Sequence, residues 1–234
     1  MNSPALYLIP VTLGDTPHEQ VLPSYNADII RSLRHFIVEE VRTARRFLKR
    51  VDSDIVIDDL TFYPMGKHAQ NDYGAYLRPI KEGHSVGVIS EAGCPAVADP
   101  GADIVALAQQ QGLRVVPLVG PSSMILAVMA SGLNGQSFAF NGYLPIDPQE
   151  RVQRLRQLEQ RAQHERQTQL FIETPYRNHK MMDTLLQTLR PNTRVCVAAG
   201  ITTPAEYIHT HTVHDWRHIT LPDLSKTPAI FLLL

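Results

Sequence analysis

The chain has 234 residues, of which 44% are hydrophobic and 19% charged, and its formal net charge is −1. This composition is typical of a soluble globular protein with one large or two small domains, and the charge gives no global argument for nucleic-acid binding. No apolar run reaches the roughly 18–20 residues that span a bilayer, and the N-terminus lacks the regions of a signal peptide, so we expect a cytoplasmic protein. The two cysteines are too few for a disulfide framework or a zinc quartet.

Strands and helices alternate along the first half of the chain. Apolar residues at helical spacing predict a helix that begins near Asn26, a candidate N-cap, and includes Ile29, Ile30, Leu33, Phe36 and Ile37. Apolar runs predict strands at residues 6–9, 55–58, 86–89 and 115–119. This alternation predicts a mainly parallel sheet.

A short basic helix follows the acidic pair Glu39 and Glu40. Its cations share faces because several lie three or four residues apart; they are Arg42, Arg45, Arg46, Lys49 and Arg50. Either nucleic acid contacts this helix or the cations form a solvated face. A carboxylate of the pair at the end of a buried strand needs a task or a partner, and an ion pair with Arg42 or Arg45 is the simpler explanation.

The loop at residues 90–101 is the most informative stretch, because it joins an apolar strand to an amphipathic helix. Backbone amides at the carboxyl end of a strand are placed to meet a ligand. The loop has glycine only at Gly93 and Gly101, so it matches neither a dinucleotide fingerprint nor a Walker A loop. We therefore expect a ligand that is not held by a phosphate cradle.

After Gly120 the pattern changes, and we place a boundary there between two α/β lobes, residues 1–119 and 120–234. Helices are predicted at residues 122–129, 150–166 and 176–189. Strands are predicted at residues 138–140, 169–172, 195–198, 206–213 and 229–233.

Three further features have a functional and a structural interpretation. Ser122 and Ser123 start a helix, where they either bind a ligand or cap the helix. Glu173, at a strand end, either contacts a ligand or favours the following helix. His68 lies in a polar loop, where functional residues are common but plain surface histidines are equally so.

The histidines also raise the question of a metal. His209 and His211 would share one side of a strand and could bind a metal together with Asp215. An exposed face of threonine and histidine explains the pattern as well, and nothing else supplies a convincing ligand set. We expect no metal site.

Several motifs, in order, resemble one family. They are Leu6-Tyr7-Leu8-Ile9-Pro10 with Gly14, Glu39-Glu40-Val41-Arg42, the loop at 90–101, Val116-Pro117-Leu118-Val119-Gly120-Pro121-Ser122-Ser123 and Gly142-Tyr143-Leu144-Pro145. Together they resemble, nearly end to end, the tetrapyrrole-methylase superfamily of S-adenosylmethionine-dependent methyltransferases. The most similar branch is the small-subunit rRNA methyltransferase I family, which methylates the ribose 2′-oxygen of a decoding-centre cytidine in 16S rRNA.

The resemblance implies a two-lobed α/β fold, with a mainly parallel sheet in the N-terminal lobe and a mixed sheet in the C-terminal lobe. It also implies a homodimer and S-adenosylmethionine bound in the cleft between the lobes. By motif position the cofactor would contact Leu13, Ser90, Glu91, Ala92, Gly93, Cys94, Val97, Ser122, Ser123, Ile172, Glu173, Pro228 and Ala229.

Methyl transfer from a sulfonium requires mainly that the nucleophile is held close to the methyl carbon and aligned with it. A hydroxyl nucleophile also benefits from a general base. Our candidates for that base are Glu39, Glu40 and His68. Arg42, Arg45 and Arg46 are the candidates for binding RNA of the small ribosomal subunit, and no membrane partner is expected.

The chain departs from the family pattern mostly in the substrate half of the site. Glu91 replaces an aspartate, Cys94 replaces a threonine, and the Glu39–Arg42 motif lacks its threonine. The usually basic stretch at residues 146–150 is acidic here, and residues 199–203 lack two cations and a carboxylate. Two alternatives therefore stay open: a methyltransferase with another acceptor, a small molecule or another RNA, and a degenerate, non-catalytic cofactor-binding protein.

Overall fold

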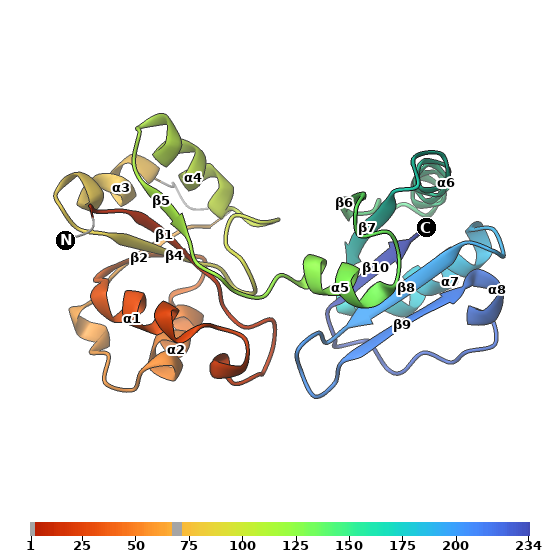
Figure 1. The fold of residues 1–234 in the computed structure, drawn as a ribbon, viewed down its shortest axis with the longest axis horizontal. Helices are drawn as coiled ribbons and strands as arrows, with labels where there is room; N and C mark the ends of the chain where they lie inside the picture. The colour runs from red at the N-terminus through yellow and green to blue at the C-terminus, as the bar shows by residue number, and fades with distance from the viewer. Residues whose placement is uncertain (1–2, 67–71) are drawn as a thin grey trace. The chain divides into compact units, whose positions relative to one another are not determined.

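The computed structural model describes residues 3–66 and 72–234. The chain forms two compact units, Met1–Ser122 and Ser123–Leu234, each built on its own five-stranded sheet (Figure 1). No helix within the described residues combines the length and the apolar character needed to cross a bilayer.

The first unit contains a wholly parallel sheet in the order β3-β2-β4-β1-β5. Its strands are β1 Leu6–Ile9, β2 His35–Val38, β3 Thr61–Pro64, β4 Val86–Ile89 and β5 Val115–Pro117. The predicted parallel sheet is thus confirmed. Because all strands run the same way, their carboxyl ends meet at one edge of the sheet, where α/β proteins bind ligands.

Helices cover both faces of this sheet (Figure 1). They are α1 Ser24–Ser32, α2 Val41–Val51, α3 Tyr73–Lys81 and α4 Gly101–Gln110, with 3₁₀ helices η1 His18–Gln20 and η2 Ile57–Asp59. Phe36 and Val38 of β2 face the cluster that includes α1 and α2, whereas Ile37 between them faces the cluster that includes α3 and α4. Such burial on both faces explains the continuous apolar runs of the strands.

Two sequence predictions in this unit are wrong. The predicted helix from Asn26 does not continue to Ile37: α1 ends at Ser32, Leu33 is extended, and Phe36 and Ile37 lie in β2. A short apolar run that is buried on both faces fits helical spacing as well as a strand. Here pairing with the neighbouring strands of the sheet makes Phe36 and Ile37 part of a strand.

The strand predicted at residues 55–58 is also wrong, because residues 57–59 form η2 and the strand follows as β3. β3 is an edge strand that pairs only with β2 within the described sheet. An edge position tolerates Pro64 and the exposed Thr61, which weakens the apolar signal of the strand.

The second unit contains the mixed sheet that the sequence predicts, in the order β6-β7-β10-β8-β9. β6 and β7 are parallel, and the other neighbours are antiparallel. The strands are β6 Phe138–Tyr143, β7 Thr168–Glu173, β8 Arg194–Ala199, β9 Tyr207–Thr212 and β10 Ala229–Leu233. The helices are α5 Ser123–Ser131, α6 Pro148–Glu165, η3 Pro175–Arg177, α7 Asn178–Thr188 and α8 Val213–Trp216.

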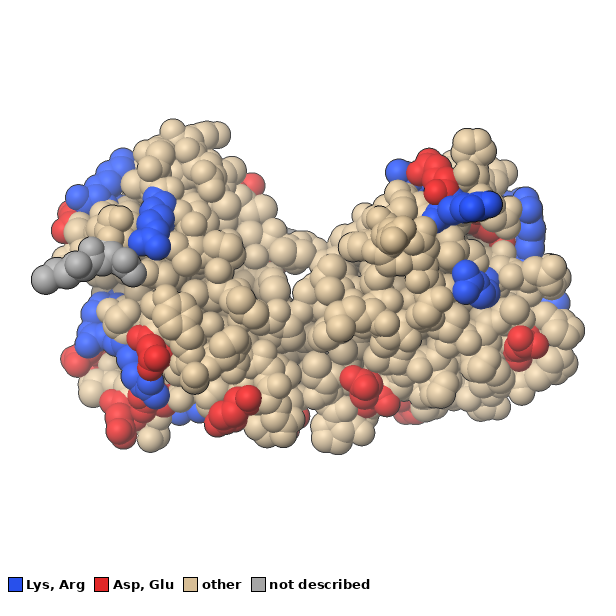
Figure 2. All heavy atoms as spheres, in the orientation of Figure 1, with Lys and Arg blue, Asp and Glu red and all other residues tan. Residues whose placement is uncertain are grey.

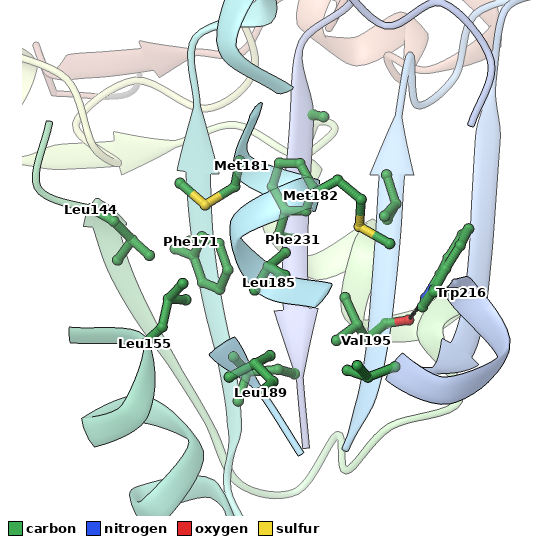
Figure 3. Close-up of a cluster of buried hydrophobic side chains, with 14 of the residues drawn as sticks. Leu144, Leu155, Phe171, Met181, Met182, Leu185, Leu189, Val195, Trp216 and Phe231 are labelled. Carbon is green, nitrogen blue, oxygen red and sulfur yellow. Dashed lines mark hydrogen bonds between the residues drawn. The ribbon is translucent and has the colours of Figure 1, made fainter. Parts of the chain in front are cut away.

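The core of the second unit lies between this sheet and α6, α7 and α8 (Figure 3). Phe171 of β7 and Phe231 of β10 stack with ring centroids 5.7 Å apart. Trp216 is 1% exposed, and its indole Nε1 donates to the carbonyl oxygen of Val195 at 2.8 Å. Each buried aromatic contributes roughly 3–5 kcal/mol by the cost of truncating it to alanine.

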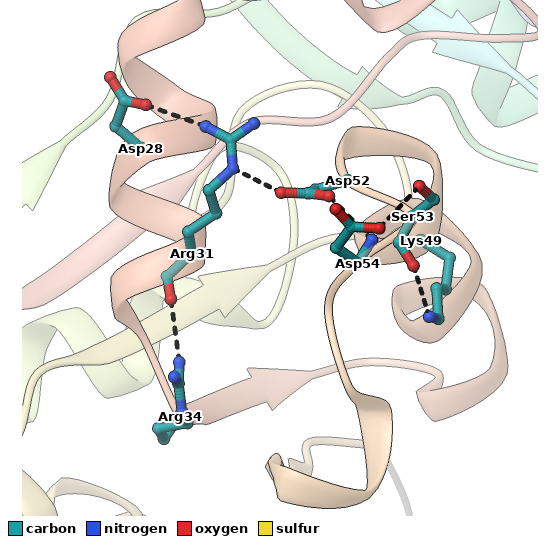
Figure 4. A network of polar contacts seen from close by, with 7 residues as sticks. All are labelled: Asp28, Arg31, Arg34, Lys49, Asp52, Ser53 and Asp54. Atoms are coloured by element: carbon teal, nitrogen blue, oxygen red, sulfur yellow. Dashed lines mark hydrogen bonds and ion pairs between the residues drawn. The ribbon is translucent and has the colours of Figure 1, made fainter.

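A polar network ties α1 to the end of α2 in the first unit (Figure 4). Arg31 Nε lies 2.5 Å from Asp52 Oδ2, and Arg31 Nη1 lies 3.0 Å from Asp28 Oδ1. Asp52 is the C-cap residue of α2. The network therefore fixes where α2, the basic helix, ends.

Candidate functional site

A pocket of about 300 Å³ opens at the carboxyl edge of the first sheet. It is formed within the first unit by the segment after β1, the end of β4 and one face of α2. Its lining residues are Val11, Thr12, Leu13, Gly14, Asp15, Thr43, Ala44, Arg46, Phe47, Arg50, Ile89, Ser90 and Glu91. A volume near 300 Å³ is at the lower end of the range for ligand sites.

Hydrogen bonds between α2 and the loop after β4 shape the polar side of this pocket. The Thr43 hydroxyl lies 2.6 Å from Glu91 Oε1 and 2.9 Å from the main-chain oxygen of Glu40. The main-chain amide of Glu91 donates to Glu39 Oε1 at 3.3 Å. The predicted residues Glu39 and Glu91 are therefore held together at the ends of β2 and β4.

Glu40 has a structural task. Its Oε1 accepts from the main-chain amide of Arg42 at 3.0 Å, which makes Glu40 the N-cap of α2. Among the described ion pairs, none joins Glu40 to Arg42 or Arg45. His68, the third candidate base, lies outside the described residues.

Three residues of the loop at 90–101 adopt the left-handed backbone conformation. Gly93, Ala96 and Ala98 have φ values of 69°, 65° and 60°, and each alanine in this region costs roughly 1–2 kcal/mol. Asp99 Oδ1 offsets that cost by accepting from the amides of Ala96 at 2.7 Å and Gly101 at 2.8 Å. Burial raises the pKa of Asp99 above its ordinary value, although these hydrogen bonds act in the opposite direction.

The same loop packs on the segment that leaves β5. Cys94 Sγ lies 3.4 Å from the main-chain oxygen of Pro121, and burial raises the pKa of this thiol. Gly93 is buried where a Cβ would lie 3.1 Å from Leu13 Cδ2 and 3.3 Å from the oxygen of Pro121. The predicted cofactor residues of the first unit thus converge, with Leu13, Ser90 and Glu91 lining one pocket.

The predicted cofactor residues of the second unit converge as well. Ala229, the first residue of β10, pairs with Glu173, the last residue of β7, and Ile230 pairs with Ile172. Pro228 directly precedes β10, and Ser123 is the first residue of α5. The buried Glu173 Oε1 lies 2.6 Å from Arg177 Nη2 and accepts from the amide of Thr174 at 2.7 Å, so this carboxylate also orders the chain that follows β7.

The basic helix α2 presents its arginines to different surroundings. Arg46 and Arg50 line the pocket, whereas the guanidinium of Arg45 lies over the ring of Phe62, 5.3 Å from its centroid. Lys49 Nζ donates to the main-chain oxygen of Ser53 at 2.7 Å. Of the three arginines predicted to bind substrate, the structure brings one, Arg46, into the pocket.

Two polar residues that line this pocket were not among the site residues proposed from the sequence, although Arg50 was named as a cation of the basic helix. Arg50 lies four residues after Arg46, so helical spacing alone would have put it on the same face. Thr43 follows the Glu39–Arg42 motif, and no pattern in the sequence shows that its hydroxyl meets Glu91.

The segments that depart from the family pattern have local structural roles. Asp147 is the N-cap of α6, because its Oδ1 accepts from the amides of Gln149 at 2.9 Å and Glu150 at 3.0 Å. Residues 200–206 form a tight turn between β8 and β9, with Gly200 and Thr202 at φ values of 58° and 69°. The acidic residue at 147 is thus explained by helix capping.

The described residues contain no group of three or more histidine, cysteine, aspartate or glutamate side chains that could hold a metal. The rings of His209 and His211 stack 6.1 Å apart on β9, and Trp216 packs edge-on against His211. On the face drawn in Figure 2, cationic and anionic side chains occur in small separate groups with uncharged surface between them.

Comparison with known proteins identifies the family. Residues 25–216 match the family described as Tetrapyrrole (Corrin/Porphyrin) Methylases. The chain belongs to this family. It is 29% identical over 207 residues to "Ribosomal RNA small subunit methyltransferase I" of Vibrio cholerae, covering 88% of this chain and 68% of the relative. It is 31% identical over 214 residues to the protein of the same name from Mesorhizobium japonicum, covering 90% and 68%.

The fold of this methylase also resembles a solved structure, the methyltransferase CobJ. The TM-score is 0.63 at 16% identity, over 99% of this chain and 94% of that one. This likeness shows a shared fold, and the family match makes the protein an S-adenosylmethionine-dependent methyltransferase.

The residues present in the methylase suit that cofactor. The loop at residues 90–101 has small side chains, two carboxylates and no lysine or arginine. A ligand with sulfonium and ammonium charges and no phosphate needs such a loop rather than a phosphate cradle. Ala92 and Val97 of this loop are exposed.

Proposed function

We propose that this protein methylates a ribose 2′-hydroxyl of small-subunit ribosomal RNA and acts in the cytoplasm. The observation that carries the proposal is the match at about 30% identity to relatives named ribosomal RNA small subunit methyltransferase I, over about nine-tenths of the chain. The pocket supports it, because it combines apolar walls, two arginines and carboxylates at the carboxyl edge of the sheet.

We assign the cofactor site to two groups of residues in two lobes, residues 1–119 and 120–234. The first group, in residues 1–119, consists of Leu13, Ser90 to Cys94 and Val97, whereas Ser122 belongs with the second group. Ser123, Ile172, Glu173, Pro228 and Ala229 form the rest of the second group. Local convergence within each unit supports this assignment, because Leu13 meets Gly93 and Ala229 pairs with Glu173.

S-adenosylmethionine would supply the methyl group from its sulfonium. The acceptor oxygen would form a bond to the methyl carbon as the carbon–sulfur bond breaks, which leaves S-adenosylhomocysteine and releases the hydroxyl proton to a base. Glu39 is our first choice for that base, since Glu40 already caps α2 and Glu39 lies beside Glu91 at the pocket. His68 remains a candidate.

We also propose that the protein is a homodimer. Phe138 and Phe140 of the edge strand β6 are 39% and 36% exposed, and Met129 of α5 is 73% exposed. Phe140 pairs with Leu170, which faces the side of the sheet that α5 covers, so these apolar groups belong to one side. Exposed apolar side chains on an edge strand are typical of an interface.

Sedimentation tests the dimer. We expect wild-type protein to sediment as a dimer and Phe140→Lys to shift it toward monomer, while Tyr25→Lys, at an exposed aromatic on α1, leaves it unchanged. A wild-type monomer at micromolar concentration would reject the dimer.

Calorimetry with S-adenosylmethionine and S-adenosylhomocysteine is the first test of the function. Transfer of a labelled methyl group to unmethylated 30S subunits, followed by mapping of the modified nucleotide, is the second. Binding of both ligands and methylation of a ribose in the subunit support the proposal. Binding without transfer to rRNA would point to another acceptor or to a non-catalytic cofactor-binding protein, and no binding of either ligand would reject the proposed cofactor site.

A further inference from the structure

The pocket in the first unit has an apolar floor and a charged rim. Val11, Phe47 and Ile89 are 5%, 8% and 2% exposed, and they lie beneath the exposed side chains of Arg46 and Arg50. Flat apolar walls with cations at the rim suit a ligand that carries both an aromatic ring and negative charge.

The two rim arginines differ from other arginines of the chain in their ion pairs. Neither Arg46 nor Arg50 forms an ion pair within the described residues, whereas Arg31, Arg177 and Arg190 each have a carboxylate partner. They lie four residues apart on α2, so their guanidinium groups project from one face. A guanidinium presents a planar fork of donors that matches phosphate oxygens.

Two of the other three cations of the same helix contact groups outside the pocket. Arg45 lies over the ring of Phe62, and Lys49 donates to the main-chain oxygen of Ser53. Neither residue lines the pocket. Arg42, the fifth cation of α2, does not line the pocket either. The other four form two pairs with similar charge and exposure, of which one pair lines the pocket.

The pocket shares a wall with the proposed cofactor site. Leu13, Ser90 and Glu91 line it, and all three are among the residues that we assign to the cofactor. A ligand in the pocket would thus lie against the group from which a methyl is taken.

We infer that this pocket holds the acceptor nucleotide of a single-stranded RNA and that Arg46 and Arg50, rather than Arg45, contact its phosphates. The inference rests on the proposed function and replaces the helix-wide basic surface, predicted from sequence at Arg42, Arg45 and Arg46, with a defined site. The base lies on the apolar floor, and the ribose is directed toward Ser90 and Glu91.

A matched pair of double variants of the full chain tests the inference. One is Arg46→Gln with Arg50→Gln, and the control is Arg45→Gln with Lys49→Gln. Both remove two positive charges from the same helix. Binding is measured by fluorescence anisotropy with a labelled single-stranded RNA that spans the decoding-centre cytidine of 16S rRNA, over a series of salt concentrations. Calorimetry with S-adenosylmethionine is measured in parallel.

We expect the pocket variant to lose about tenfold or more in RNA affinity at low salt, and its slope of log affinity against log salt to decrease by about 1.4, or about 0.7 per lost phosphate contact. The control should lose less than about threefold, since its cations act only at longer range. Affinity for S-adenosylmethionine should stay unchanged in both variants.

Three results would overturn the inference. Equal losses in the two variants would mean that RNA follows the whole basic helix. Unchanged RNA affinity in the pocket variant would mean that the pocket takes another ligand. A loss of S-adenosylmethionine affinity in that variant would assign the pocket to the cofactor. Failure of the proposed function is distinguishable, because it appears in the wild-type protein as absent cofactor binding or absent methyl transfer.

Discussion

The hydroxyl of Thr43 lies 2.6 Å from Oε1 of Glu91, and this contact joins the first turn of α2 to the loop after β4. The family motif has its threonine at position 41, where this chain has valine. Thr43 is two residues further on and reaches the neighbouring loop. The chain therefore lacks the family's threonine at position 41 but has the hydroxyl of Thr43 in the same helical turn. This hydroxyl contacts Glu91, which itself replaces the aspartate of the family pattern.

Removing this hydroxyl tests whether the contact positions Glu91. We expect Thr43→Val to weaken S-adenosylmethionine binding or methyl transfer roughly fivefold, which corresponds to about 1 kcal/mol, the usual worth of one hydrogen bond. Thr43 is exposed, so the midpoint of urea unfolding should change little. Thr43→Ser keeps the hydroxyl and should behave as wild type. If the serine and valine variants were equally impaired, the methyl group of Thr43 rather than its hydroxyl would matter.

Gly120 should not tolerate a side chain. A Cβ at this position would lie 2.2 Å from Cγ and 2.3 Å from Cβ of Pro10, and a proline ring cannot rotate away. Gly120→Ala is expected to lower the free energy of unfolding by about 1–3 kcal/mol, the usual cost of overpacking. In Gly135→Ala the nearest atom would be 3.6 Å away, so that variant should stay within about 0.5 kcal/mol of wild type. Urea unfolding followed by circular dichroism would distinguish them, and equal midpoints would contradict the expectation.

The ion pair between Arg31 and Asp52 predicts a pH-dependent contribution to stability. The hydrogen bond from Arg31 holds the pKa of Asp52 below its ordinary value. The stabilisation is therefore fully present above the ordinary aspartate pKa and is lost as the pH falls through the lowered value. The difference in unfolding free energy between wild type and Arg31→Gln should thus be constant near neutral pH and shrink in acid.

Arg34→Gln is the control for this prediction, because Arg34 donates only to main-chain oxygens of Arg31 and Leu33 among its described contacts. Its effect on unfolding should not depend on pH over the same interval. A difference for Arg31→Gln that grew as the pH fell would reverse the assigned sign.

Both cysteine thiols should be unreactive in the folded protein. Burial raises the pKa of Cys94 and raises the pKa of Cys196 to about 11. At pH 7 the thiolate fraction of Cys196 is then about one in ten thousand, and the thiolate is the reacting species. Labelling with a chromogenic disulfide should be much slower in native protein than in urea. Rapid labelling of Cys94 in native protein would show instead that it is a reactive thiol.

The regular part of the fold could be predicted from the sequence, and the reasons are physical. β1, β4 and β10 begin and end where their apolar runs do, because a buried strand needs an uninterrupted apolar run. β2 could not be separated from α1, since Phe36 and Ile37 fit both periods. β3 is an edge strand with little apolar signal.

The site was predictable only in part. The loop at residues 90–101 stands out by its glycine and proline content, and the acidic pair by its place before a basic helix. The rotation of α2 about its axis determines which cations line the pocket. Packing of Phe47 and Leu48 into the core sets that rotation, which the spacing of the arginines in the sequence does not predict.

Asp99 holds the loop that carries Ala96 and Ala98 in its left-handed turns through hydrogen bonds within the loop itself. A ligand therefore does not have to order this loop, because the loop loses its conformational entropy when the protein folds and not when the ligand binds. Its two alanines are also positions where a β-branched side chain would clash with its own backbone. Substitution of either alanine by a β-branched residue should therefore lower the yield of folded protein more than it lowers the affinity of the folded protein for its ligand.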